Sequence, residues 1–183
     1  MRVKILNSLS ELKLPRYKDL PDFGIYSEQL VEIVNKALEA MFDEDNKLTK
    51  SMVNNYVKHK IMPSPIKKRY FRNHIVYCIV ITVLKNILSI AEIDEGILHE
   101  LNKSPIEESY NYFCNKMEEV MRLVISILDR KSSPEIKGRA SIDIDLDKRN
   151  GLTLAIVSVC TKVITQKLLK YELLNAKEDK WVK

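Results

Sequence analysis

Apolar residues recur at steps of three and four along most of the chain, a pattern typical of amphipathic helices. One such stripe predicts a helix over residues 27–42. A second predicts a shorter helix from Thr49, a residue type that caps helices, to about Lys60. Because residues 43–46 are all polar, we expect them to separate the two helices.

The most apolar stretch, residues 75–84, follows a break that contains Pro63 and Pro65. Proline cannot continue a helix, so we expect the basic segment 66–72 to form a loop or a small wing. We predict a buried helix over 75–88 with Asn73 as its cap, although its β-branched residues would also suit a buried strand. The run is shorter than the roughly 20 residues that a bilayer span requires, so we expect no membrane contact.

Two further helix starts are visible. Ser89 and Glu92 have the spacing of a capping box, which predicts a helix over 90–101. Ser104 followed by Pro105 predicts a longer helix that ends near residue 130. A last helix is expected over 152–176, and we expect the intervening segment 131–149 to be an ordered loop.

The pattern predicts an all-α fold in two lobes. Two proline steps within residues 14–23 favour extended backbone, so residues 1–26 are expected to form an arm that lies across the body. One helical lobe is expected over 27–103 and a second over 104–183. The two long helices of the second lobe carry broad apolar faces, and we expect them to serve dimerisation.

Charge is distributed unevenly along the 183 residues, whose formal net charge is +5. Residues 46–91 contain nine basic residues and no carboxylate, which leaves 21 basic and 25 acidic residues in the rest of the chain. A solvated basic helix face would explain an ordinary charge cluster. The complete absence of acids favours instead a surface for an anionic partner.

The residue types in this basic window suit double-stranded DNA. We expect the helix over 49–60 to turn Lys50, Ser51, Asn54, Asn55 and Lys58 outward, and asparagine can bind adenine through two hydrogen bonds. Two tolerated surface asparagines are the plain alternative. Phosphate contacts are expected from Lys67, Lys68, Arg69 and Arg72. Tyr70 would either donate to a phosphate or, as we prefer, pack under the wing.

The order of these elements resembles the winged helix-turn-helix of the MerR family over residues 27–101. That family has a segment T-L-R-Y-Y-E-x-x-G-L-L-P-P, to which M-V-N-N-Y-V-K-H-K-I-M-P at 52–63 is similar. Its wing and third helix resemble R-Y-F-R-N-H-I at 69–75, and its S-L-x-E-I resembles residues 89–93. The resemblance implies a DNA-binding regulator. The chain departs from the family in three ways: the wing glycine is missing, Asn54 replaces the arginine of the recognition helix, and one residue is deleted before Ser89. These departures imply a shortened wing.

Three segments are more closely similar to a bacterial family known only as a domain of unknown function (1836). They are LPRYKDLP at 14–21, LTKSMVNNYVKH at 48–59 and KKRY at 67–70. We expect this resemblance to extend over nearly the whole chain. It implies a shared topology but no activity, substrate or effector.

Signals for enzymatic activity are weak. His59, His74 and His99 lack metal-ligand spacing, and the pairs at 107–108 and 118–119 are interpreted as solvated carboxylates. We therefore expect no catalysis, metal or cofactor. Three scattered cysteines without a C-x-x-C pair favour a cytoplasmic protein.

These observations predict a homodimeric transcriptional regulator that binds specific DNA sequences. The alternative is a non-enzymatic interaction module whose basic face binds an acidic partner. A weaker alternative is a domain that binds a small molecule and has lost its contact with DNA.

Overall fold

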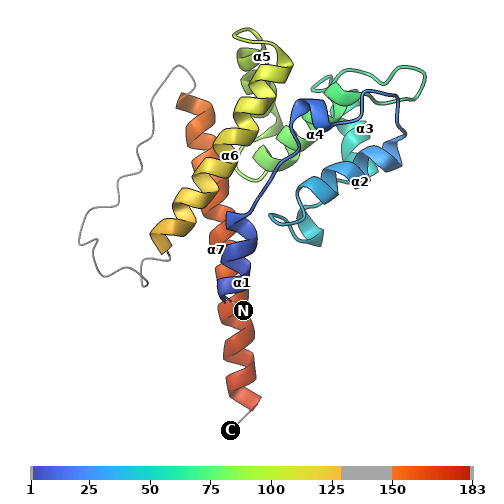
Figure 1. The fold of residues 1–183 in the computed structure, drawn as a ribbon. Helices are drawn as coiled ribbons and strands as arrows, with labels where there is room; N and C mark the ends of the chain where they lie inside the picture. The colour runs from blue at the N-terminus through green and yellow to red at the C-terminus, as the bar shows by residue number, and fades with distance from the viewer. Residues whose placement is uncertain (1, 129–149, 182–183) are drawn as a thin grey trace. The chain divides into compact units, whose positions relative to one another are not determined.

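The computed structural model describes residues 2–128 and 150–181. The regular secondary structure of these residues consists of helices (Figure 1). The helices are α1 (Arg2–Ser10), α2 (Ser27–Ala37), α3 (Lys50–Lys58), α4 (Arg72–Leu84), α5 (Ile90–Leu101), α6 (Ile106–Leu128) and α7 (Asn150–Trp181), with 3-10 turns at Tyr17–Asp19 and Glu44–Asn46. Extended pairing in this part of the chain is limited to two isolated β-bridges. The all-α prediction is confirmed, and the expected loop 131–149 lies outside the described residues.

The chain divides into two compact units. The first unit comprises residues 13–116, and the second unit joins residues 1–12 to residues 117–183. Helix α6 therefore begins in the first unit and ends in the second. The functions assigned to the predicted lobes stay predictions.

The core of the first unit is α4, which is buried on nearly every side. Nine of its residues are buried, and Ile75, Ile79 and Val83 have no exposed surface. Helices α2 and α5 pack against α4, and α2 also packs against α3. The apolar run 75–84 is therefore a helix and not the alternative buried strand. Other helices cover it, and it forms no strand pairing among the described residues.

Helix α4 begins earlier than the sequence predicted, at Arg72 rather than after Asn73. The reason is a cap made by the buried His74, whose Nδ1 accepts the backbone N–H of Phe71 at 2.9 Å. The other ring nitrogen lies 3.4 Å from the carbonyl oxygen of Ser64. A histidine in the third helical position thus does what glutamate does in an ordinary capping box.

Residues 13–26 of the predicted arm lie in the first unit and are held there by polar contacts. Tyr17 donates its backbone N–H to Asn111 at 2.9 Å and its hydroxyl to Asn73 at 2.7 Å. The hydroxyl of Tyr110 donates to the carbonyl of Pro15 at 2.9 Å. Residues 13–26 therefore bridge the start of α6 and the start of α4.

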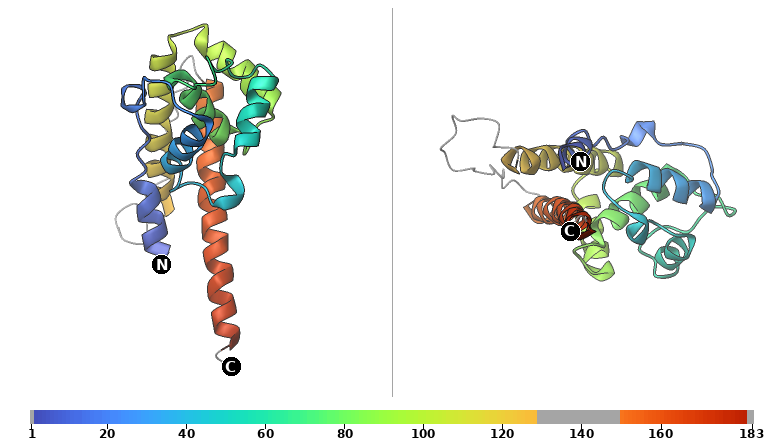
Figure 2. Two further views of the ribbon diagram at one scale, coloured as in Figure 1. Left: turned by 90° about the vertical axis from the view of Figure 1, so that its right-hand side faces the viewer. Right: turned by 90° about the horizontal axis from the view of Figure 1, so that it is seen from below.

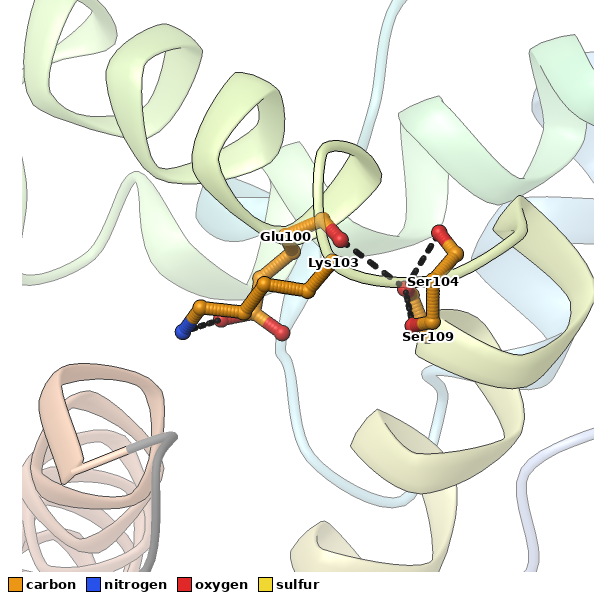
Figure 3. A network of polar contacts seen from close by, with 4 residues as sticks. All are labelled: Glu100, Lys103, Ser104 and Ser109. Atoms are coloured by element: carbon orange, nitrogen blue, oxygen red, sulfur yellow. Dashed lines mark hydrogen bonds and ion pairs between the residues drawn. The ribbon is translucent and has the colours of Figure 1, made fainter.

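The junction between α5 and α6 is also polar (Figure 3). Ser104 and Ser109 join their hydroxyls at 2.8 Å, and Lys103 pairs with Glu100 at 3.3 Å. Helix α6 begins at Ile106, one residue later than predicted, and the N–H of Ser109 in its first turn reaches the carbonyl of Pro105 at 3.0 Å. The capping box of Ser89 and Glu92 at the start of α5 is confirmed.

The second unit contains an element that the sequence did not reveal. Residues 2–10, expected to be part of the arm, form α1, which packs against α7 and buries Leu6 and Leu9. Helix α7 itself buries a stripe that includes Ile156 and Val159. Glu118, expected to be solvated, is buried and lies 3.9 Å from Arg122.

Helix α7 is also the one described helix that is long and apolar enough to cross a bilayer. The qualifying segment is Asn150–Leu173, and a third of its most apolar window is buried inside the protein. This test concerns length and composition alone. The apolar helix α4, in the first unit, is too short to meet it.

The link between α2 and α3 generates a first prediction. The side chain of Asn35 accepts the backbone N–H of Leu48 at 2.8 Å and donates to its carbonyl at 3.0 Å. Asn35→Ala removes both bonds, so we expect the free energy of unfolding to fall by about 1–3 kcal/mol in urea denaturation. Lys36→Ala, at an exposed position beside it, is the control and should be neutral. Equal stability of both variants would show that the amide does not hold the turn.

Candidate nucleic-acid interface

The short helix α3 is fixed by signals at both ends. The Thr49 hydroxyl accepts the N–H of Met52 at 3.3 Å, as the sequence predicted. At the other end Lys60 has a left-handed φ of 59°, and the N–H of Ile61 reaches the carbonyl of Tyr56 at 3.0 Å. This is a Schellman ending, in which the left-handed residue is ordinarily glycine.

The predicted outward face of α3 is exposed. Val53 and Tyr56 are buried, and burial raises the pKa of Tyr56 to about 12. The residues on the other side of the helix are all exposed: Lys50, Ser51, Asn54, Asn55 and Lys58. The structure thus brings five of the ten predicted site residues to one surface.

The predicted wing is a two-residue hairpin. Ile66 and Arg69 exchange backbone hydrogen bonds of 3.0 and 2.9 Å, and Lys67 and Lys68 between them have φ values of 49° and 62°. Two positive φ angles define a type I′ turn, for which Asn-Gly is the preferred pair. Lysine in this conformation costs on the order of 1 kcal/mol at each position. The turn therefore places two ammonium groups at its tip at the expense of stability.

The arm anchors this hairpin. Ile25 and Tyr70 exchange two backbone hydrogen bonds of 2.8 Å each. A Cβ on Gly24 would lie 2.9 Å from the Cβ of Arg69, so only glycine allows this close approach. Tyr70 is buried edge-on against His74, with ring centroids 5.4 Å apart. Tyr70 therefore packs under the wing, as preferred from the sequence, and burial raises its pKa.

The two arginines expected to bind phosphate are engaged within the first unit. The guanidinium of Arg69 lies 3.6 Å from the centroid of the Tyr26 ring. Arg72 donates to the carbonyl of Leu20 at 2.9 Å and lies 3.8 Å from a carboxylate oxygen of Asp22. Both arginines hold the arm, a role that the sequence did not indicate because the arm lies about 45 to 50 residues away.

Folding also brings carboxylates to a window that has none in sequence. Lys50 bonds to Glu28 of α2, and this hydrogen bond is the main reason that the pKa of Glu28 is lowered to about 2. Lys47 pairs with Glu44. In contrast, no ion pair is found within the described part of the chain for four exposed lysines: Lys58, Lys60, Lys67 and Lys68.

The sequence matches the family described as a domain of unknown function (DUF1836) over residues 15–113, just over half of the chain. The chain belongs to the DUF1836 family. No curated protein and no solved structure matches it. The DUF1836 segment lies entirely inside the first unit, where the match covers residues 15–26, α2 to α5 and the start of α6. The expected extension over nearly the whole chain is not found.

The comparison gives no support to the MerR-like arrangement. The DUF1836 segment joins α2 to α3 through residues 38–49, a longer connection than the three or four residues of a helix-turn-helix. The winged helix-turn-helix therefore stays a hypothesis.

The strained turn generates a second prediction. Replacing Lys67 with Asn and Lys68 with Gly supplies the residues that a type I′ turn prefers, so we expect the protein to become more stable by about 1 kcal/mol. Urea denaturation measures the change. Replacing both lysines with Gln removes the same charges but keeps residues that are strained at positive φ, so it is the control for loss of repulsion between them. Destabilisation by the Asn-Gly variant would contradict the assigned turn.

Proposed function

We propose that this DUF1836 protein is a cytoplasmic, non-enzymatic transcriptional regulator that binds specific sequences of double-stranded DNA. The observation that carries the proposal is the exposed face of α3, where two asparagines lie between lysines. Base edges in the major groove are read by short polar side chains, while longer cations bind phosphates. Helix α3 offers both on one side.

The contact surface consists of the outer face of α3 together with the hairpin tip at Lys67 and Lys68. Asn54 and Asn55 are the base-reading candidates, with Ser51 beside them. Phosphate contacts come from four lysines for which no ion pair is found among the described residues: Lys58, Lys60, Lys67 and Lys68. Arg69 and Arg72 support the surface from behind, since their guanidinium groups already hold the arm.

A base-reading asparagine leads to a third prediction. Asn54→Ala or Asn55→Ala should cost about 1–3 kcal/mol on a DNA site selected by the purified protein, because a bidentate contact to adenine is lost. Affinity for random duplex should hardly change. Fluorescence anisotropy on the two DNAs measures both quantities.

Glu32→Ala, at an exposed position of α2, serves as the control. Full discrimination by both asparagine variants would remove α3 from the role of reading helix. Absence of any binding that weakens with salt would remove DNA binding altogether.

The ion pair between Glu28 and Lys50 leads to a fourth prediction. Glu28→Gln removes a negative charge from the surface and frees Lys50 for a phosphate. We expect tighter binding to all duplexes and a salt dependence steeper by about 0.9 in the log-log slope. The same slope in wild type and variant would mean that Lys50 does not reach the backbone.

A second candidate function is supported by a specific surface. Tyr26, Arg69 and Ile66 lie side by side across the two β-bridges, and Tyr26 and Ile66 are 50% and 62% exposed. Aromatic and arginine side chains are enriched at the centres of protein interfaces. An interaction module for an acidic partner would use this row together with Lys67 and Lys68. It predicts that Tyr26→Ala abolishes partner binding while the asparagine substitutions do not.

A further inference from the structure

Lys85 belongs to the basic window of residues 46–91 but has no role in the contact surface formed by α3 and the hairpin tip. It follows α4 directly and is half-buried. Its ammonium group donates to the sulfur of Met52 in α3 at 3.4 Å, and a thioether is a weak acceptor. No ion pair is found for Lys85 among the described residues. Its charge is therefore poorly compensated by the protein, and burial lowers its pKa.

The end of α4 does not use the ammonium group of Lys85 as a cap. A lysine near the end of a helix often donates to the last carbonyl groups. Here the side-chain amide of Asn86 does so, with hydrogen bonds of 2.9 and 3.0 Å to the carbonyls of Thr82 and Val83. The side chain of Lys85 extends instead to α3.

Met52 marks one edge of the exposed face of α3. It is partly exposed, and helical spacing places it next to Asn55 and His59, both of which are exposed. Because the ammonium group of Lys85 contacts Met52, it lies along this edge of the candidate reading face. A cation at the edge of a reading helix is placed to bind phosphate while the helix itself contacts bases.

Helices α3 and α4 lie next to one another in the first unit and run in roughly opposite directions (Figures 1 and 2). Met52, near the start of α3, contacts Lys85 at the end of α4. Ser64, in the chain that follows α3, lies 3.4 Å from His74 near the start of α4. The hairpin directly precedes α4. Lys85 and the hairpin tip therefore lie toward opposite ends of α3.

Cations at both ends of α3 suit a partner with two backbones. The nine residues of α3 span about 14 Å, and the major groove is about 12 Å wide with a phosphate backbone on each side. At the start of α3, Lys50 is paired with Glu28, so Lys85 supplies the available positive charge there. A single strand would offer a backbone to one end only.

We propose that Lys85 binds a phosphate of one DNA strand while Lys67 and Lys68 at the hairpin tip bind the opposite strand. The inference rests on the proposed function, because it assumes that α3 enters the major groove. A phosphate gives the ammonium group of Lys85 a strong acceptor in place of the sulfur of Met52. Unlike Lys50, Lys85 reaches that phosphate without leaving a carboxylate.

The contact itself is tested by the salt dependence of binding to duplex DNA. Lys85→Met removes the charge and keeps a flexible apolar side chain beside Met52. We expect the log-log slope to become shallower by about 0.9, and the affinity at 0.1 M salt to fall by about eightfold. Lys85→Arg keeps the charge and should keep the wild-type slope. Lys18→Met, at a lysine that pairs with Glu107 at 3.4 Å, is the matched control and should also keep it.

Urea denaturation separates this role from a structural one. Lys85→Met should be at least as stable as the wild type, because a half-buried charge is replaced by an apolar group. Lower stability together with an unchanged slope would make Lys85 a structural residue and refute the proposal.

The strand assignment is tested by ethylation interference on a duplex selected by the purified protein. Ethylation neutralises a phosphate, so it weakens binding wherever a cation contacts that phosphate. In Lys85→Met, one phosphate of one strand should lose its effect on binding. In the double variant Lys67→Gln with Lys68→Gln, phosphates of the opposite strand should lose theirs. Losses on the same strand in both variants would contradict the proposed arrangement.

Failure of this inference can be distinguished from failure of the proposed function. A wild-type protein that binds duplex DNA with the same salt slope as Lys85→Met overturns the role of Lys85 and leaves DNA binding by α3 standing. A wild-type protein that does not bind duplex DNA overturns both.

Discussion

The first unit is organised by the burial of α4. A helix that is apolar on all sides loses stability wherever it meets water, so other elements must surround it. Helices α2 and α5 pack on it directly, and the sulfur of Met62, after α3, lies 3.6 Å from that of Cys78. Helix α3 is consequently held with Val53 and Tyr56 inward. The exposed asparagines on its other side follow from the same constraint.

Folding changes the electrostatic picture that the sequence presents. Along the chain the basic window has no acids, but in space Glu28 reaches Lys50 and Asp22 reaches Arg72. Exposed pairs of this kind contribute little to stability. Their importance lies in which cations remain available, because a lysine that must leave a carboxylate binds an anion less strongly than one without a partner. The available charge is therefore concentrated at the end of α3 and at the hairpin tip.

Local signals in the sequence predicted local structure well. The caps at Thr49 and Ser89 and the start of α5 depend on neighbours within three residues, so they could be identified before the structure. The outward face of α3 also followed from helical spacing alone. Helix α1 could not be identified, because its few leucines acquire meaning only against α7. The roles of Arg69 and Arg72 were hidden for the same reason, since their partners lie in the distant arm.

At the hairpin tip the structure reveals a backbone conformation that the sequence did not indicate. Sequence alone shows two lysines in a basic segment, which is unremarkable on a solvated surface. The structure shows that both adopt left-handed backbone, where asparagine and glycine would cost less. Residues that break a local rule without a packing benefit point to function, because stability has been given up for something else. Neither lysine is buried or ion-paired among the described residues. What the two lysines add to the tip is exposed positive charge. Their strained backbone therefore supports binding of an anionic partner at the hairpin more strongly than the composition did.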